Sequence, residues 1–151
     1  MNKYVDNYEI NEDTMLLLPL GENLCHIIEY NDEFTVKLGS NEIIDYSCKY
    51  YGSSYIGRYE GTKAILGYSY KLPIVIDEVK NVIFFPTCSP RYGKACWINP
   101  KYVKKFIQKE RKTTIIFTNE KTILLDISYR SFENQILRAT YLENTLRNRR
   151  K

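Results

Sequence analysis

Residues 47–62 read SCKYYGSSYIGRYEGT, and the pattern of the chain changes around this stretch. Before it, short apolar runs are typical of strands, whereas between residues 42 and 66 apolar positions recur with a helix-like period. Three glycines interrupt that period, and a glycine inside a helix costs about 1 kcal/mol relative to alanine. The sequence therefore predicts a central helical segment, rich in glycine and tyrosine, that is broken into two short pieces.

The same stretch indicates a contact surface. A glycine lets the backbone approach another surface closely, which offsets its cost within an element. The cations and small hydroxyls beside the glycines suit phosphate oxygens. We therefore predict that the segment contacts nucleic acid through Lys49, Ser53, Ser54, Arg58 and Lys63. The structural alternative for Arg58 is a buried ion pair with an acid from residues 1–45.

The remaining chain reads as one α+β domain over residues 1–151, a length that buries a real core. Apolar runs bounded by turn residues predict several short, mainly antiparallel strands. These lie at Tyr8–Ile10, Met15–Leu20, Leu24–Tyr30, Phe34–Leu38, Ile74–Ile76 and Val82–Phe85, with a hairpin of Thr113–Thr118 and Thr122–Ile127.

Two more helices are predicted after residue 99. Asn99 and Pro100 suit a cap and a first helical position, so residues 101–109 are expected to be helical, with a short strand as the alternative. Ser131 can cap a final amphipathic helix. Its apolar face is formed by Phe132, Ile136, Ala139, Leu142 and Leu146.

Charge is divided unevenly along the chain. Residues 1–45 hold 2 basic and 10 acidic side chains, whereas residues 46–151 hold 20 basic and 8 acidic ones. Such a division suggests a polyanionic partner for the larger part. Further candidate contacts are Arg91 and Lys94 in an irregular loop, with Arg147, Arg149 and Arg150 as auxiliary phosphate contacts. Lys104, Lys105 and Lys109 fit either phosphate contact or a solvated face.

Enzymatic activity is not expected. The single histidine, His26, lies in a strand pattern without a motif partner for general-base catalysis. The spacing of Cys25, Cys48, Cys88 and Cys96 matches no common zinc site and fits reduced thiols. No phosphate-binding GxxxxGK[ST] loop occurs. We therefore expect no cofactor, no metal and, because no signal peptide or membrane span is recognisable, a cytoplasmic, nucleoid-associated protein.

Several runs resemble the ComK family of bacterial competence transcription factors. They include the Gly52-Ser53-Ser54-Tyr55 run with its following glycines, and the later runs Phe85–Thr87, Cys96–Ile98, Ile127–Tyr129 and Ser131–Gln135. The resemblance is collinear from about residue 8 to about residue 142. It implies an activator of DNA-uptake genes that binds paired A·T-rich boxes through the minor groove, as a dimer or a pair of dimers.

Longer members of that family continue to a Phe-Met-Leu-Tyr-Pro-like element that recruits an adaptor for proteolysis. No such element occurs up to Lys151, so the sequence is expected to be a short member without this control. The alternative function is that of a paralogue that has lost activation or DNA reading and modulates a ComK-like partner protein. A third interpretation, single-stranded nucleic-acid binding, relies on the 14 tyrosines as stacking platforms.

Overall fold

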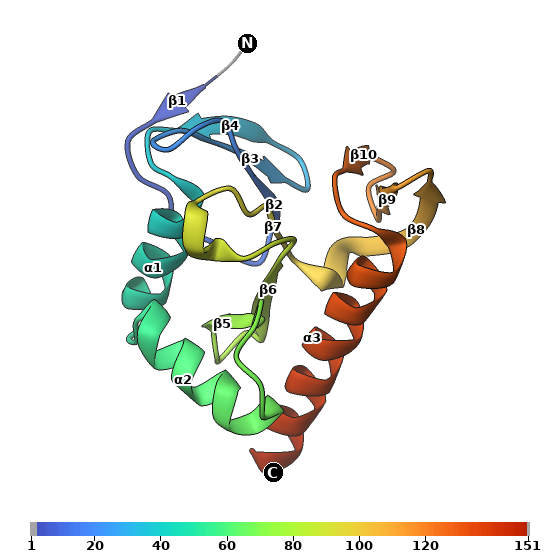
Figure 1. Ribbon diagram of the computed structural model, residues 1–151. Coiled ribbons are helices and arrows are strands. Elements are labelled where there is room, and N and C mark those ends of the chain that lie inside the picture. Colours follow the sequence, from blue (N-terminus) through green and yellow to red (C-terminus); the bar gives the residue numbers. More distant parts are fainter. Residues whose placement is uncertain (1–2, 151) are drawn as a thin grey trace.

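The computed structural model describes residues 3–150 and shows an α+β fold with helices on both sides of a large sheet (Figure 1). Seven strands form this sheet in the order β1-β4-β3-β2-β7-β6-β5. All neighbours are antiparallel except β1 and β4. The strands are β1 (Tyr4–Val5), β2 (Thr14–Pro19), β3 (Cys25–Glu29), β4 (Glu33–Val36), β5 (Ile74–Asp77), β6 (Val82–Pro86) and β7 (Trp97–Ile98).

A second, three-stranded antiparallel sheet has the order β10-β9-β8. It comprises β8 (Val103–Lys109), β9 (Lys112–Phe117) and β10 (Thr122–Leu125). The α-helices are α1 (Ser40–Tyr50), α2 (Tyr55–Leu66) and α3 (Tyr129–Arg149), and short 3-10 turns occupy Pro90–Tyr92 and Pro100–Tyr102.

The large sheet buries a different apolar cluster on each face because side chains alternate along its strands. Leu17, Ile27 and Phe84 point toward α1 and α2. Their neighbours Leu16, Ile28 and Phe85 point to the opposite face, where they join Ile115, Phe117 and Phe132 of the small sheet and α3. The molecule therefore has helices α1 and α2 on one face, and α3 with the small sheet on the other (Figure 1).

The central helical segment has the predicted break. Gly52 adopts a positive φ of 92° between α1 and α2, a conformation that favours glycine. Ser54 then caps α2 by accepting a hydrogen bond from Gly57 N–H at 3.0 Å. Gly67, at φ 79°, ends the helix in the left-handed conformation common at helix C-termini. The Ser54 cap and the Gly67 C-terminus thus offset part of the free-energy cost of the glycines inside α2.

Three details of the sequence prediction were wrong. The helix expected over residues 101–109 is the strand β8, which pairs with β9 along most of its length. Residues Tyr8–Ile10 are not a strand, although Tyr8 and Ile10 are buried. The final helix is capped by Ser128, whose Oγ accepts from Ser131 N–H at 3.2 Å, and not by Ser131. The hairpin of β9 and β10 and the amphipathic α3 are confirmed.

Candidate nucleic-acid interface

Helices α1 and α2 present the residues that the sequence singled out, but several of those residues already have partners. Lys49 Nζ lies 2.9 Å from Asp45 Oδ2, one helical turn earlier on α1. The Ser54 hydroxyl is occupied by capping α2. Lys63 is exposed in the last turn of α2 and forms no ion pair within residues 3–150. The hydroxyls and cations of this segment are therefore unequally available to a partner.

Arg58 is the most enclosed of the predicted cations. Its side chain is only 16% exposed, and Nη1 lies 3.3 Å from Glu78 Oε2. The acid is not one from residues 1–45, which was the structural alternative considered for this arginine. Nε of Arg58 is buried and has no hydrogen-bond partner within residues 3–150. One side of the guanidinium is thus paired while another polar atom of the same side chain is not.

A narrow groove of about 160 Å³ lies between α2 and α3 and brings three predicted residues together. Ser53 and Arg58 line it from the α2 side, and Arg150 lines it from the end of α3. Arg150 also approaches Glu78, at 3.9 Å, and donates to Asn81 Oδ1 at 2.6 Å. Glu78 therefore sits between two arginines from different helices, and all three groups are joined in one charged cluster.

The remaining predicted cations lie elsewhere. Arg91 borders a separate cavity of about 670 Å³ that is also lined by Tyr55 and Tyr59, and exposed Lys94 follows in the same loop. On α3, Arg147 forms an ion pair with Glu143. Arg149 is exposed and makes no ion pair within the described chain. The ten predicted residues are thus spread over several surfaces and are not gathered in one site.

The hairpin of β8 and β9, which we call the basic hairpin (residues 103–117), is a second basic surface. Its exposed cations are Lys104, Lys105, Lys109, Arg111 and Lys112. Sequence reasoning left Lys104, Lys105 and Lys109 open between phosphate contact and a solvated face, and favoured a helix over the strand that carries them. The spacing of Tyr102, Val103, Phe106 and Ile107 fits a helix, and for this reason the strand β8 was not favoured. The run of β-branched residues in 113–116 was the available signal, because it needs a neighbouring strand.

Ion pairs fix the far end of the small sheet. Lys104 Nζ lies 2.6 Å from Glu120 Oε1, and Lys121 binds Glu33 at the start of β4. Hydrogen bonds from Lys121 and then from His26 hold the pKa of Glu33 below its usual value. His26 lies on β3, and its Nε2 is 2.8 Å from Glu33 Oε1. This histidine is part of a structural network that joins the two sheets.

Within residues 3–150, no three His, Cys, Asp or Glu side chains gather in a way that could hold a metal ion. None of the helices described there is both long and apolar enough to cross a bilayer.

Comparison with known proteins gives a consistent match. The ComK protein family matches residues 5–151. The chain is 38% identical over 149 residues to the competence transcription factor of Bacillus subtilis (strain 168), covering 96% of this chain and 78% of the relative. That relative is a transcription factor and not an enzyme, in agreement with the expectation from the sequence. No solved structure matches the chain.

Proposed function

The chain belongs to the ComK family, and from this premise we propose that it is a DNA-binding regulator of competence transcription. The observation that carries the proposal is the match to a competence transcription factor along 96% of the chain. The excess of 20 basic over 8 acidic side chains in residues 46–151 supports a nucleic-acid partner.

The proposed target is a duplex with paired A·T-rich boxes, bound through the minor groove. An A·T-rich minor groove is narrow, and its enhanced negative potential attracts arginine and lysine side chains. No helix-turn-helix, zinc finger or basic zipper was recognisable from the sequence, so a helix inserted in the major groove is not the model we favour. The whole chain would then act as one DNA-binding domain, without a cofactor, in the cytoplasm at the nucleoid.

The proposed contacts in the predicted set differ in availability. Lys63, Lys94 and Arg149 are exposed without ion pairs in the described chain, so they are free to bind phosphate. Lys49, Arg58, Arg147 and Arg150 would exchange a carboxylate or amide partner for phosphate, which lowers their net contribution. The complete proposed set is Lys49, Ser53, Ser54, Arg58, Lys63, Arg91, Lys94, Arg147, Arg149 and Arg150.

Self-association is the second part of the proposal. Among the exposed large apolar side chains, those around α1 and α2 and those on α3 form two candidate surfaces. Ile56 is 71% exposed and Tyr70 61% on the first surface, and Leu137 is 60% and Tyr141 59% exposed on the second. Either surface suits contact with another copy of the chain, and paired boxes would be read by a dimer or a pair of dimers.

A mobility-shift titration over a salt series tests this function. Duplexes with two A·T-rich boxes are compared with a G·C-rich duplex and with single strands. We expect cooperative, preferential binding to the boxes that weakens steeply as salt rises. Absence of binding even at low salt would refute direct DNA recognition and direct the search to a ComK-like partner protein. Preference for single strands would favour binding by tyrosine stacking instead.

A further inference from the structure

We propose that the basic hairpin is a DNA-binding arm, with Lys109, Arg111 and Lys112 on phosphates that border the minor groove. The inference rests on the proposed function and adds to it an element outside the proposed set of ten contacts; of its three cations, the sequence had left Lys109 open and had not indicated Arg111 or Lys112. Its support comes from strand register, unpaired charge, position and rigid attachment.

Strand register places the exposed cations on one face. Lys105 pairs with Ile116, Ile107 with Thr114, and Lys109 with Lys112. Side chains at alternate positions share a face. The opposite face holds Phe106, Ile115 and Phe117, which pack into the apolar cluster. The outer face of the hairpin is therefore formed by Lys105, Ile107, Lys109, Lys112, Thr114 and Ile116, and contains no carboxylate.

The charge at the tip is not balanced within the protein. Lys109 and Lys112 are direct cross-strand partners, and like charges placed opposite each other destabilise a sheet. Arg111 lies in the turn between them, where Glu110 is the only acid. None of the three cations forms an ion pair within residues 3–150. An anion bound at the tip would relieve the repulsion between the lysines.

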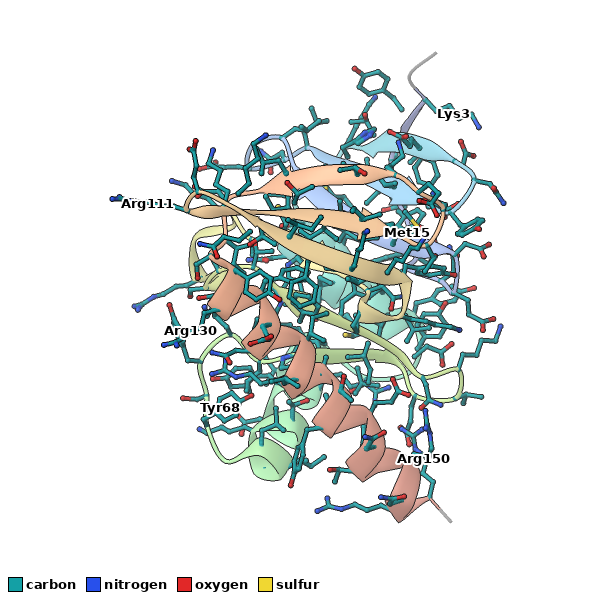
Figure 2. The ribbon with its side chains drawn as sticks, turned by 90° about the vertical axis from the view of Figure 1, so that its right-hand side faces the viewer. Lys3, Met15, Tyr68, Arg111, Arg130 and Arg150 are labelled. Carbon is teal, nitrogen blue, oxygen red and sulfur yellow. The ribbon has the colours of Figure 1, made fainter. Side chains whose placement is uncertain are left out.

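The tip lies at the edge of the protein. Figure 2 shows Arg111 pointing outward at the end of the hairpin. A two-residue turn joins the strands, with Glu110 at a positive φ of 57° as its first central residue. Such turns match the twist of paired strands and keep a hairpin narrow. Narrow β-ribbons are among the elements that proteins place in DNA grooves.

The inner face of the hairpin is fixed to the core up to the tip. The ring of Phe106 lies 5.0 Å from that of Tyr129 and 4.9 Å from that of Phe132, both on α3. Thr113 is buried and donates from Oγ1 to Ile127 O at 2.7 Å. The cations are thus presented by a strand pair fixed to the core, so little order has to be gained when DNA binds.

The first test neutralises the three tip cations together as Lys109→Gln, Arg111→Gln and Lys112→Gln. Each lost phosphate contact lowers the slope of log affinity against log salt by about 0.9, so the slope should fall by about 2.7. The fold loss of DNA affinity between 50 and 200 mM salt should then be about 40-fold smaller than in the wild type. The control, Lys3→Gln, Lys37→Gln and Lys80→Gln, removes the same charge from lysines that pair with acids.

A reduced slope in the tip variant, with the control near wild type, supports the arm. An unchanged slope in a wild-type protein that binds the boxes overturns the arm and leaves the proposed function standing. A wild-type protein that binds no duplex overturns both. A thermal melt of each variant establishes folding, and exposed substitutions of this kind should leave the melting temperature close to that of the wild type.

The second test maps the tip on DNA. The Arg111→Cys variant, in a Cys88→Ser background, is labelled at its new thiol with a chelated iron. The iron cleaves the DNA sugars that lie near it. Cys88 is the exposed native thiol, whereas burial raises the pKa of Cys25 and Cys48 to about 12 and of Cys96 to about 11. Those thiols react slowly because the thiolate is the nucleophile. Cleavage confined to the boxes, with the strand offset of a minor-groove source, supports the arm; absent or uniform cleavage overturns it.

Discussion

The segment formed by α1 and α2 and the basic hairpin both carry several cations, but the cations of the two regions differ in the groups that they contact. In the segment, Lys49 and Arg58 are paired with Asp45 and Glu78. At the hairpin tip, Lys109, Arg111 and Lys112 have no such partners in the described chain. Basic composition alone therefore does not identify a site for a polyanion. The pairing of each cation decides how much of its charge a partner can use.

Helix α3 connects the two regions and provides the largest expected effect. Phe132 is fully buried and its ring lies 4.9 Å from that of Phe106 under the hairpin. Phe132→Ala should lower the free energy of unfolding by about 3–5 kcal/mol because it leaves a cavity. Urea unfolding measures the loss. Glu133→Ala, at an exposed site on the same helix, is the control and should be nearly neutral.

Amide exchange sharpens this prediction. Because Phe132 supports the hairpin through Phe106, protection in residues 103–117 should fall more than protection in α2. Equal loss of protection in both regions would mean that they unfold as one unit. It would contradict the view that the basic hairpin and the α1–α2 segment are distinct regions.

The next effect concerns Arg58. If it exchanges Glu78 for a phosphate or a base edge, Arg58→Ala should weaken binding to an A·T-rich duplex by about 1–3 kcal/mol. Glu78→Gln frees the same arginine and should leave the affinity unchanged or slightly higher. Fluorescence anisotropy measures both. Lower thermal stability in both variants with unaltered DNA affinity would instead make the Arg58–Glu78 pair purely structural.

A smaller effect is expected at the start of α2. Ser54 accepts the hydrogen bond from Gly57 N–H, so Ser54→Ala should reduce stability by about 1 kcal/mol. Ser53→Ala is the matched control, since Ser53 does not cap the helix. Chemical denaturation compares the two. Equal losses would show that the cap does not stabilise this glycine-rich helix.

The smallest predicted effect concerns the ion pairs of Glu33, which join the two sheets. The pKa of Glu33 is lowered, first by Lys121 and then by His26, so its pairing stabilises the fold above the ordinary pKa of 4.5. That contribution is lost as pH falls below 4.5 through the lowered value. Glu33 is 40% exposed, so the effect should be below about 1 kcal/mol.

Unfolding of Glu33→Gln and wild type at a series of pH values measures this contribution. The stability difference should be present at pH 7 and should shrink as pH falls below 4.5. Glu22→Gln, at an exposed position, is the control. A difference between Glu33→Gln and wild type that persists at the lowest pH would place its cause outside the titration of Glu33.

The sequence predicted the fold class well because most of its elements have strong local patterns. The break at Gly52, the β9–β10 hairpin and the apolar stripe of α3 all follow from residues close together in the chain. Strand β8 was predicted only as the alternative to a helix, because Val103 and Phe106 fit a helical period as well as a strand. Pairing with β9 decided between them, and pairing is a tertiary property.

The candidate site was harder to predict for the same reason. Arg58 and Glu78 are 20 positions apart, and their ion pair exists only once α2 packs beside β5. That Lys109 and Lys112 form no ion pair within residues 3–150 is likewise a property of the folded surface. Residue types indicated a polyanion partner, but the available cations could be identified only from the three-dimensional structure.

The most direct test measures salt dependence for two triple variants on the same A·T-rich two-box duplex. One variant carries glutamine at the hairpin tip, at 109, 111 and 112, and the other at Lys49, Arg58 and Lys63. The slope of log affinity against log salt is expected to fall by about 2.7 in the first variant and by about 1 in the second, where Lys63 is the one cation without an ion pair within residues 3–150. Equal slopes, or a larger fall in the second variant, would contradict this expectation.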